Sequence, residues 1–329
     1  MAFATLGSSV FDREDLAGHI MEVNNRGGFV AGLVAPALPV DKASGTLMVV
    51  SATTGKTLEN TKRGRGGAYP EVSGSLSTSS YSTEDHGAHF TVESTQAAAY
   101  RNQIDMDKAG AEAAFSTVAT RYEYDMFAGS ASVYTLVSGN AAAAAWTSYS
   151  TATPAADVAV EAAEITKLHG IGKDQMTLLI PRARADILPF VDHVRARLQI
   201  TSEPFTGSLT ADQLARYFGV KEVIIAGAVY NSANEAQTAS MSYIHPTNTC
   251  LLFVRCDGNP ANFAGFARTP VWDDTTPYET VVDRIEAGGI PVIIDQIWDA
   301  DNRVMKYRAR NYRGLWTHIA TMGRKVTGI

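Results

Sequence analysis

Residues 214–231 read LARYFGVKEVIIAGAVYN, and this stretch contains a helix, a sharp turn and a buried strand in quick succession. The helix begins at Thr210 to Gln213, a capping box in which a threonine hydroxyl and a glutamine side chain satisfy free backbone N–H groups. Gly219 ends the helix, because glycine enters the left-handed backbone conformation without steric cost. Val223 to Ile225 then has the β-branched, apolar composition of a buried strand. The stretch predicts a domain in which helices cover a sheet.

Strands and helices continue to alternate on both sides of this stretch. Met176 to Ile180 and Leu251 to Val254 are short apolar runs that predict two further buried strands. Between the first strand and the capping box, Ala185 to Leu198 predicts a helix. The sequence therefore indicates a mixed α/β domain in its second half.

The end of the sequence predicts a long hairpin. Two extended segments, Ile290 to Trp298 and Arg303 to Ile319, are separated by the polar sequence Asp299-Ala300-Asp301-Asn302. Asp and Asn favour tight turns, because their side chains bond to nearby backbone groups. We therefore expect two strands joined at this turn.

Two longer helices are predicted in the first half of the sequence. The first spans roughly Asp105 to Ala128 and ends at Gly129, with an i,i+4 pair of Arg121 and Asp125. Its apolar residues recur at helical spacing and comprise Phe115, Val118, Ala119, Tyr122 and Met126. The second helix has Thr153 as its N-cap and Pro154 at its first position, and it closes at Gly170. One face of it carries Val158, Ala162, Ile165 and Leu168.

The segment ahead of these helices has little apolar material of its own. Asp12 to Val23 could form a short helix, and two extended segments follow at Val34 to Val40 and Gly45 to Val50. The prolines of the first extended segment exclude it from the centre of a sheet. Large aliphatic residues almost vanish from Thr53 to Glu84, which includes the basic, glycine-rich run Thr61 to Gly67. This stretch is either a long projecting hairpin that becomes ordered on another surface or a disordered loop.

Composition excludes several classes of protein. The 329 residues include 28 Lys or Arg and 34 Asp or Glu, so the formal net charge is −6. A protein whose main task is to grip phosphates needs a surplus of basic residues. Charged residues make up 19% of the chain, below the roughly 25% of an average soluble domain. A surface low in charge suits wide packing against other chains, although an ordinary alanine-rich protein has the same composition. No segment approaches the roughly 18 apolar residues of a membrane-spanning helix.

No pattern in the sequence predicts catalytic residues, a cofactor or a metal site. His86 and His89 stand near two carboxylates, but they lie in or beside the polar segment, where nothing fixes the positions of ligands. Gly170 to Lys173 lacks the glycine spacing and the Ser or Thr of a phosphate-binding loop. Cys250 and Cys256 bracket an apolar strand, so we expect two reduced thiols that serve as inert packing.

The order of these elements resembles the major capsid protein of tailed bacteriophages, in the short form without its own scaffolding domain. The resemblance rests on Val34 to Val40, the basic glycine-rich loop, the long helix after it, and residues 214–231 followed by Leu251 to Val254. It implies an α+β tailed-phage major capsid fold. By this likeness we expect an N-terminal arm (1–55), an extended loop (56–92), a spine helix with a peripheral domain (93–170), an axial domain (171–285), and peripheral strands with a tip loop and a return to the axial domain (286–329).

The resemblance also implies a function. The protein would be a structural subunit, not an enzyme, that assembles as pentamers and hexamers into an icosahedral head around double-stranded DNA. Its partners would be copies of itself, a separate scaffolding protein, a portal and, as an option, a decoration protein, without cofactor or membrane. It would be located in the virion capsid after assembly in the host cytoplasm. Candidate contacts between subunits are Lys62, Arg63 and Arg65 of the extended loop, the acidic Asp283 and Glu286, and the tip residues Asp299, Asp301 and Asn302.

Three other functions stay open on sequence grounds. A bacterial encapsulin-like nanocompartment shell would have the same fold but enclose enzyme cargo. An RNA-binding protein could use Lys62 to Gly67, although a single basic run on an acidic chain is weak evidence. An enzyme with an unrecognised site is the third alternative.

Overall fold

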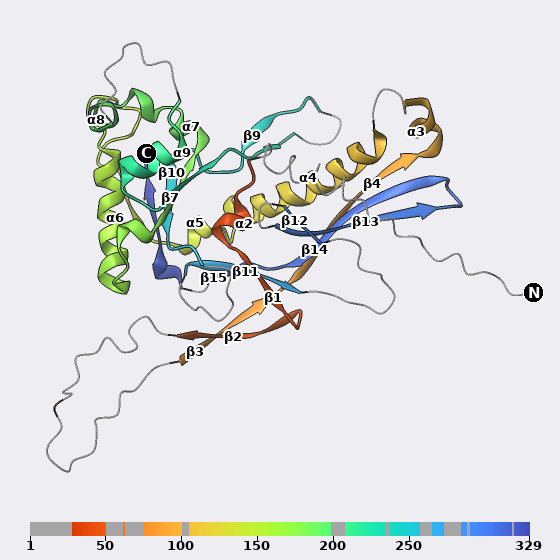
Figure 1. The fold of residues 1–329 in the computed structure, drawn as a ribbon, viewed down its shortest axis with the longest axis horizontal. Helices are drawn as coiled ribbons and strands as arrows, with labels where there is room; N and C mark the ends of the chain where they lie inside the picture. Colours follow the sequence, from red (N-terminus) through yellow and green to blue (C-terminus); the bar gives the residue numbers. More distant parts are fainter. Residues whose placement is uncertain are drawn as a thin grey trace, which may run out of the picture.

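A computed structural model describes residues 28–50, 62, 76–100, 105–198, 208–233, 237–256, 265–272, 284–287, 290–317 and 319–329. Over these residues the strands form a seven-stranded sheet, a five-stranded sheet and two separate two-stranded hairpins. Figure 1 shows the five-stranded sheet and its helices at one end of the molecule, and the longer sheet with a long helix at the other. In the described part of the chain, no helix is both long and apolar enough to span a bilayer.

The five-stranded sheet is the best-buried part of the molecule. Its strands, in spatial order, are β5 (Gly139–Ala141), β16 (Gly323–Thr327), β10 (Thr249–Phe253), β6 (Thr177–Pro181) and β7 (Glu222–Ala226). Every residue of β6 and β10 is buried. Helices α6 (Pro154–His169) and α9 (Ala211–Phe218) pack on this sheet and on each other. These strands are buried because continuous apolar runs replace the alternating pattern of a half-exposed strand.

The seven-stranded sheet is dominated by a long antiparallel hairpin. Strands β13 (Ile290–Asp299) and β14 (Val304–Arg313) form this hairpin, and β4 (Glu84–Glu93) pairs along the whole length of β14. Helix α4 (Met106–Phe127) lies against β4 and β14 (Figure 1). The remaining strands are β1 (Ala37–Val40), β11 (Ala267–Trp272), β12 (Arg284–Ala287) and β15 (Trp316–Thr317), and α3 (Ser94–Tyr100) follows β4.

Short elements connect and extend the two sheets. The two-stranded hairpins are β2 (Ser44–Val50) with β3 (Leu76–Ser82), and β8 (Val229–Asn231) with β9 (Met241–Tyr243). The short helices are α2 (Ala31–Val34), α5 (Val133–Leu136), α7 (Arg182–Ala185) and α8 (Asp192–Arg197), with 3₁₀ turns at Lys173–Gln175, Leu188–Phe190 and Ala320–Met322.

The helices with clear end signals are confirmed. Asp105 accepts backbone hydrogen bonds as the N-cap of α4, and the five apolar residues expected on its inner face are all buried. Gly170 ends α6 with a positive φ of 71°, and Gly219 ends α9 with a φ of 69°. The capping box at Thr210 and Gln213 is formed in both directions. Strong local signals at helix ends therefore predicted the structure well.

Four local predictions are wrong. Ala185 to Leu198 is not one helix: α7, a 3₁₀ turn and α8 replace it, because Pro189 inside that range cannot continue an α-helix. Leu168 is 46% exposed, and His169 takes the buried position at the end of α6. The second strand of the terminal hairpin ends at Arg313 rather than Ile319. The C-cap of α4 is Ala128, one residue before Gly129.

The elements group by sheet and not strictly by sequence order. Hairpin β2–β3 joins residues on both sides of position 55, the expected end of the N-terminal arm. Helix α6 precedes residue 170, the expected end of the peripheral domain. It packs mainly on strand β16 of the five-stranded sheet and on helix α9. Strand β1 carries Pro39 and pairs only with β11 among the described strands, as expected for a proline-containing edge strand. The expected helix at Asp12 to Val23 lies outside the described residues.

Candidate functional site

The hairpin β2–β3 is the clearest example of an element that contributes little to the packing of its own described chain. Its strands pair from Ser44 opposite Ser82 to Val50 opposite Leu76, and they make no extensive contact with any other helix or strand among the described residues. None of the described side chains in these two strands is buried, and Met48 is 51% exposed. Figure 1 shows the hairpin projecting away from both sheets. A two-stranded ribbon is at best marginally stable alone, so this one requires another surface.

The turn at the end of β13–β14 holds two of the predicted contact residues in a closed network. Asp299 accepts hydrogen bonds from the Asn302 backbone at 3.2 Å, from the Asn302 amide at 2.9 Å and from Lys306 Nζ at 2.8 Å. The bond from Lys306, followed by those from Asn302, holds the pKa of the Asp299 carboxyl well below its usual range. Arg303 closes the turn in the left-handed conformation, with a φ of 54°. Asp301 is exposed.

The other predicted contact residues are placed only in part. Lys62 is exposed, whereas Arg63, Arg65 and Asp283 lie outside the described residues. Glu286 lies in β12, where its backbone is opposite Pro291. No pairing between the basic and the acidic group is therefore established, and their contact between subunits stays a prediction.

A buried carboxylate that the sequence did not reveal joins three parts of the fold. Glu123 of α4 is fully buried and accepts hydrogen bonds from the backbone N–H groups of Val30, at 3.1 Å to each oxygen, and Ala31, at 2.8 Å. His245 Nε2 lies 2.7 Å from the same carboxylate, and the centres of the His245 and Phe127 rings are 4.1 Å apart. Glu123 therefore ties α2, the long helix and the segment after β9 to one point. A carboxylate with three donors is stable in this position, whereas an unpaired one would not be.

A second network fixes α4 to the sheet. Asp125 pairs with Arg121 at 2.9 Å on the same helix, as predicted, and with Arg313 of β14 at 3.1 Å. The Arg313 guanidinium also lies 4.5 Å from the centre of the Tyr122 ring. The Tyr122 hydroxyl is 2.5 Å from the Thr269 hydroxyl of β11. These contacts fix the C-terminal part of α4 to β11 and β14, and Tyr122, Thr269 and Arg313 are the buried members of the network.

The histidines and cysteines weighed for metal or thiol chemistry have structural surroundings. His86 and His89 lie on β4, opposite Asn311 and Arg308. Burial, and then the charge of Arg313, lower the pKa of His86. Within the described residues, no group of three His, Cys, Asp or Glu side chains is arranged to hold a metal ion. Cys250 and Cys256 are buried free thiols, and burial raises the pKa of Cys250 to about 12.

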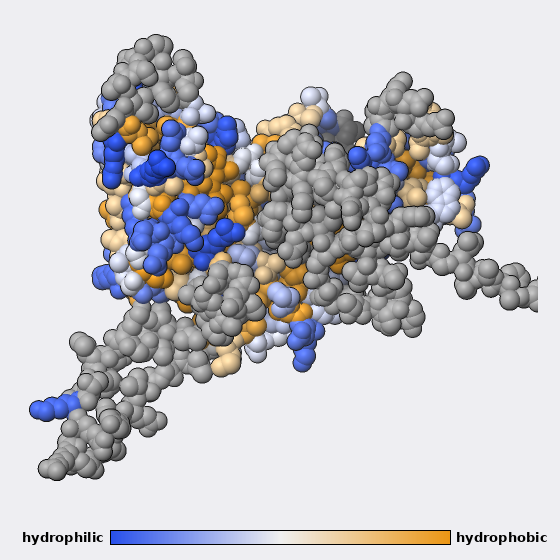
Figure 2. Space-filling model, viewed as in Figure 1, coloured by the Kyte–Doolittle hydropathy of each residue, from blue (hydrophilic) through white to orange (hydrophobic). Residues whose placement is uncertain are grey.

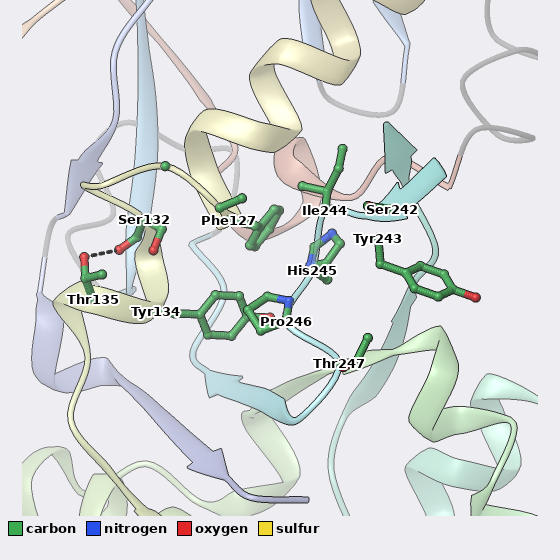
Figure 3. Close-up of a pocket in the computed structure, with 12 residues that line it drawn as sticks. Phe127, Ser132, Tyr134, Thr135, Ser242, Tyr243, Ile244, His245, Pro246 and Thr247 are labelled. Carbon is green, nitrogen blue, oxygen red and sulfur yellow. Dashed lines mark hydrogen bonds between the residues drawn. The ribbon is translucent and has the colours of Figure 1, made fainter. Parts of the chain in front are cut away.

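A pocket that no sequence pattern predicts lies beside His245. It has a volume of about 670 Å³ and opens between the end of α4 with α5 on one side and the segment after β9 on the other (Figure 3). Its lining residues are Phe127, Ala128, Gly129, Ser132, Tyr134, Thr135, Ser242, Tyr243, Ile244, His245, Pro246 and Thr247. Segments more than 100 residues apart form its walls, so no local sequence signal could have indicated it.

Comparison with known proteins identifies the fold. No protein-family model matches the chain, and no curated protein matches its sequence. Among solved structures, a phage-related protein from Bordetella bronchiseptica RB50 aligns with a TM-score of 0.64 and 15% identity, covering 98% of each chain. A virus-like particle from Pyrococcus furiosus gives 0.52 and 11% identity over 95% of this chain and 98% of that one. A chain from the capsid of an empty GTA particle gives 0.51 and 10% identity over 91% and 89%.

The class that these likenesses define is an α+β fold shared with capsid and virus-like particle chains. The alignments cover nearly the whole of this chain, so the likeness extends to both sheets and the hairpin and not to one motif alone. The expectation of a tailed-phage major capsid fold is confirmed. At these levels of identity the likeness establishes the fold, and function has to be argued from the surfaces of this chain.

Proposed function

We propose that this protein is the structural subunit of a phage head, which assembles as pentamers and hexamers into an icosahedral shell around double-stranded DNA. The observation that carries the proposal is the hairpin β2–β3, which has no buried side chain among those described and makes no extensive contact with another described element. A folded chain that builds such a ribbon must stabilise it on a neighbour. The capsid-like fold supports another copy of the chain as that neighbour.

The architecture fits this function. The long sheet with α4 would form the peripheral domain, the five-stranded sheet the axial domain at the centre of each capsomer, and β2–β3 the extended loop. The turn Asp299 to Asn302 would lie near local three-fold junctions. The net charge of −6 suits the wall of a container, because DNA has to be packed without being trapped by phosphate contacts. We propose no enzymatic activity, and we propose a separate scaffolding protein, a portal and an optional decoration protein as partners, with assembly in the host cytoplasm.

An encapsulin-like shell around protein cargo is the second candidate function. The specific observation in its favour is the likeness to the virus-like particle from Pyrococcus furiosus, which spans 98% of that chain. Both candidates require a closed shell, and they differ in what the shell encloses.

The test is electron microscopy of the purified chain, combined with extraction of nucleic acid and protein cargo from any particles. Shells that are empty or contain DNA support the phage head, whereas shells filled with a second protein support the nanocompartment. Small oligomers of uniform size, at all concentrations and salt conditions tested, would overturn both proposals.

A further inference from the structure

The pocket beside β9 lacks charge. None of its twelve lining residues is Asp, Glu, Lys or Arg, although charged residues make up 19% of the chain. Its volume of about 670 Å³ falls within the range of roughly 300–1,000 Å³ that is typical of small-molecule sites. A charged molecule placed there would lose its hydration without gaining a partner of opposite sign. The lining therefore suits an uncharged occupant.

The rim of the pocket continues this uncharged surface over β9. Tyr243 of that strand lines the pocket and is 48% exposed, and Met241 is 62% exposed. Figure 2 shows pale and orange-tinted rather than deep blue atoms over the β8–β9 hairpin, at the position of the β9 label in Figure 1. Inside the pocket, Phe127 and Pro246 contribute a ring from each wall (Figure 3). A flat, partly apolar molecule would remove water from these faces on binding.

Two polar atoms of the lining residues are buried and have no hydrogen-bond partner among the residues that the structure describes. They are the hydroxyl of Tyr134 in α5 and Nδ1 of His245 after β9. The two side chains are only 6% and 2% exposed, and they come from the two walls of the pocket (Figure 3). Nearly all buried polar groups in folded proteins have a partner, because an unsatisfied one costs free energy. An occupant of the pocket that reaches these atoms would supply the missing bonds.

The surroundings of the two atoms define what each can bind. Both oxygens of Glu123 accept backbone N–H groups, and its Oε1 lies 2.7 Å from His245 Nε2. A carboxylate only accepts, so Nε2 carries a proton, and Nδ1 of the neutral ring is an acceptor. Burial raises the pKa of Tyr134 well above its usual value, so its hydroxyl keeps its proton and can donate. The pocket therefore requires a ligand with one donor and one acceptor, which the N–H and C=O of an amide supply together.

We infer that this pocket binds an uncharged ring compound with an amide group, whose N–H donates to His245 Nδ1 and whose C=O accepts a hydrogen bond from the Tyr134 hydroxyl. The inference goes beyond the proposed shell function and does not depend on it. Because Glu123 joins α2 and α4 to His245, an occupant bound to His245 strengthens that junction. It stabilises the folded chain, because the unfolded chain has no such site.

The probe is benzamide, which has one aromatic ring and one amide group. Isothermal titration calorimetry of the full, unassembled chain should give a Kd of about 1 mM or lower for this small ligand. Benzoate has almost the same shape but carries a charge and no donor at neutral pH, so it should bind at least about tenfold more weakly. Toluene keeps the ring and lacks the amide, so it should bind at least about fivefold more weakly. No binding of benzamide, or equal affinity for the three compounds, would overturn the inference.

Two variants and a control locate the site. Tyr134→Phe removes an unpartnered hydroxyl, so it should leave the melting temperature of the ligand-free chain unchanged or higher but weaken benzamide binding at least about fivefold. Thr247→Arg places a charge at an exposed lining position and should weaken binding at least about tenfold. Thr151→Arg, at an exposed threonine outside the lining, is the matched control and should bind benzamide like the unmodified chain.

Unchanged benzamide binding by either lining variant would place the ligand elsewhere and overturn the inference. A lower melting temperature of the ligand-free Tyr134→Phe chain would also overturn it, because the hydroxyl would then already have a water molecule as its partner.

Discussion

The five-stranded sheet and the hairpin β2–β3 show two opposite ways in which one chain uses its strands. In β6 and β10, with five residues each, every side chain is buried. In β2 and β3, with seven residues each, none of the described side chains is buried. Burying one large aliphatic side chain contributes about 1.5–3 kcal/mol, so the sheet stabilises itself within one copy. Among its described residues the hairpin buries no side chain in its own chain, and under the proposed function a neighbouring copy would stabilise it.

The largest expected effect comes from damage to the self-sufficient region. Phe253 of β10 is fully buried, with Phe266 at 6.1 Å between ring centres. Phe253→Ala should lower the free energy of unfolding by about 3–5 kcal/mol, because it leaves a cavity that the sheet cannot close. Urea denaturation of the unassembled chain measures this. Met48→Ala in the hairpin is the matched control and should change that free energy by less than about 0.5 kcal/mol. Equal effects at the two positions would remove the distinction between the regions.

The buried junction at Glu123, which ties α2, α4 and the segment after β9 together, should be the next most sensitive place. Glu123→Gln keeps the size of the side chain but puts an amide donor where only acceptors fit, opposite Val30, Ala31 and His245. The substitution should lower the free energy of unfolding by about 1.5–3 kcal/mol, the range for hydrogen bonds to a charged group. Thermal or urea unfolding measures the loss. Glu112→Gln on the same helix, where the glutamate is only half-buried, is the control. An unchanged midpoint for Glu123→Gln would mean that this junction contributes little.

What the sequence could predict follows the same division between local and distant signals. The ends of α4, α6 and α9 depend on residues within a few positions, such as Asp105, Gly170 and Thr210, and they were predicted closely. The break after α7 is also a local matter, because Pro189 lies in the 3₁₀ turn that follows and cannot continue an α-helix. Glu123 and His245 are 122 residues apart. Nothing local to either residue indicates that they meet, so the buried junction and the pocket beside it could not be predicted.

Deletion of the sequence between β2 and β3 should separate stability from assembly. Deleting residues 57–75 leaves both strands, β2 and β3, in place. The free energy of unfolding of the unassembled chain should change by less than about 0.5 kcal/mol, because no other helix or strand that the structure describes makes extensive contact with β2 or β3. Closed shells should be lost, as judged by electron microscopy. Normal shells from the deleted chain would show that the extended loop is dispensable for assembly.

The basic residues of the extended loop should have a smaller effect that depends on salt. Reversal of Arg63 and Arg65 to Glu tests whether they meet acidic groups, such as Asp283 and Glu286, on a neighbouring copy. An exposed pair contributes only about 0–1 kcal/mol, and ions screen it over about 8 Å at physiological salt. Assembly yield should therefore fall most at low salt and recover in part at high salt. A yield that responds to neither change would mean that the loop binds its neighbour through its shape and through uncharged contacts.

The smallest effect is expected at the turn Asp299 to Asn302, which is exposed but internally bonded. Asp299→Asn removes the charge that accepts the hydrogen bond from Lys306, so it should lower the melting temperature only slightly at neutral pH. The pKa of Asp299 is lowered in the folded chain, so its contribution is complete above the ordinary carboxyl pKa of about 3.9 and is lost as the pH falls through the folded value. The difference in melting temperature between the two chains should therefore be constant near pH 7 and shrink below about pH 4. Asp301→Asn, at the exposed neighbouring position, is the control and should show no such trend. A difference that grew toward acidic pH would mean that the carboxylate destabilises the turn, contrary to the bonds it accepts.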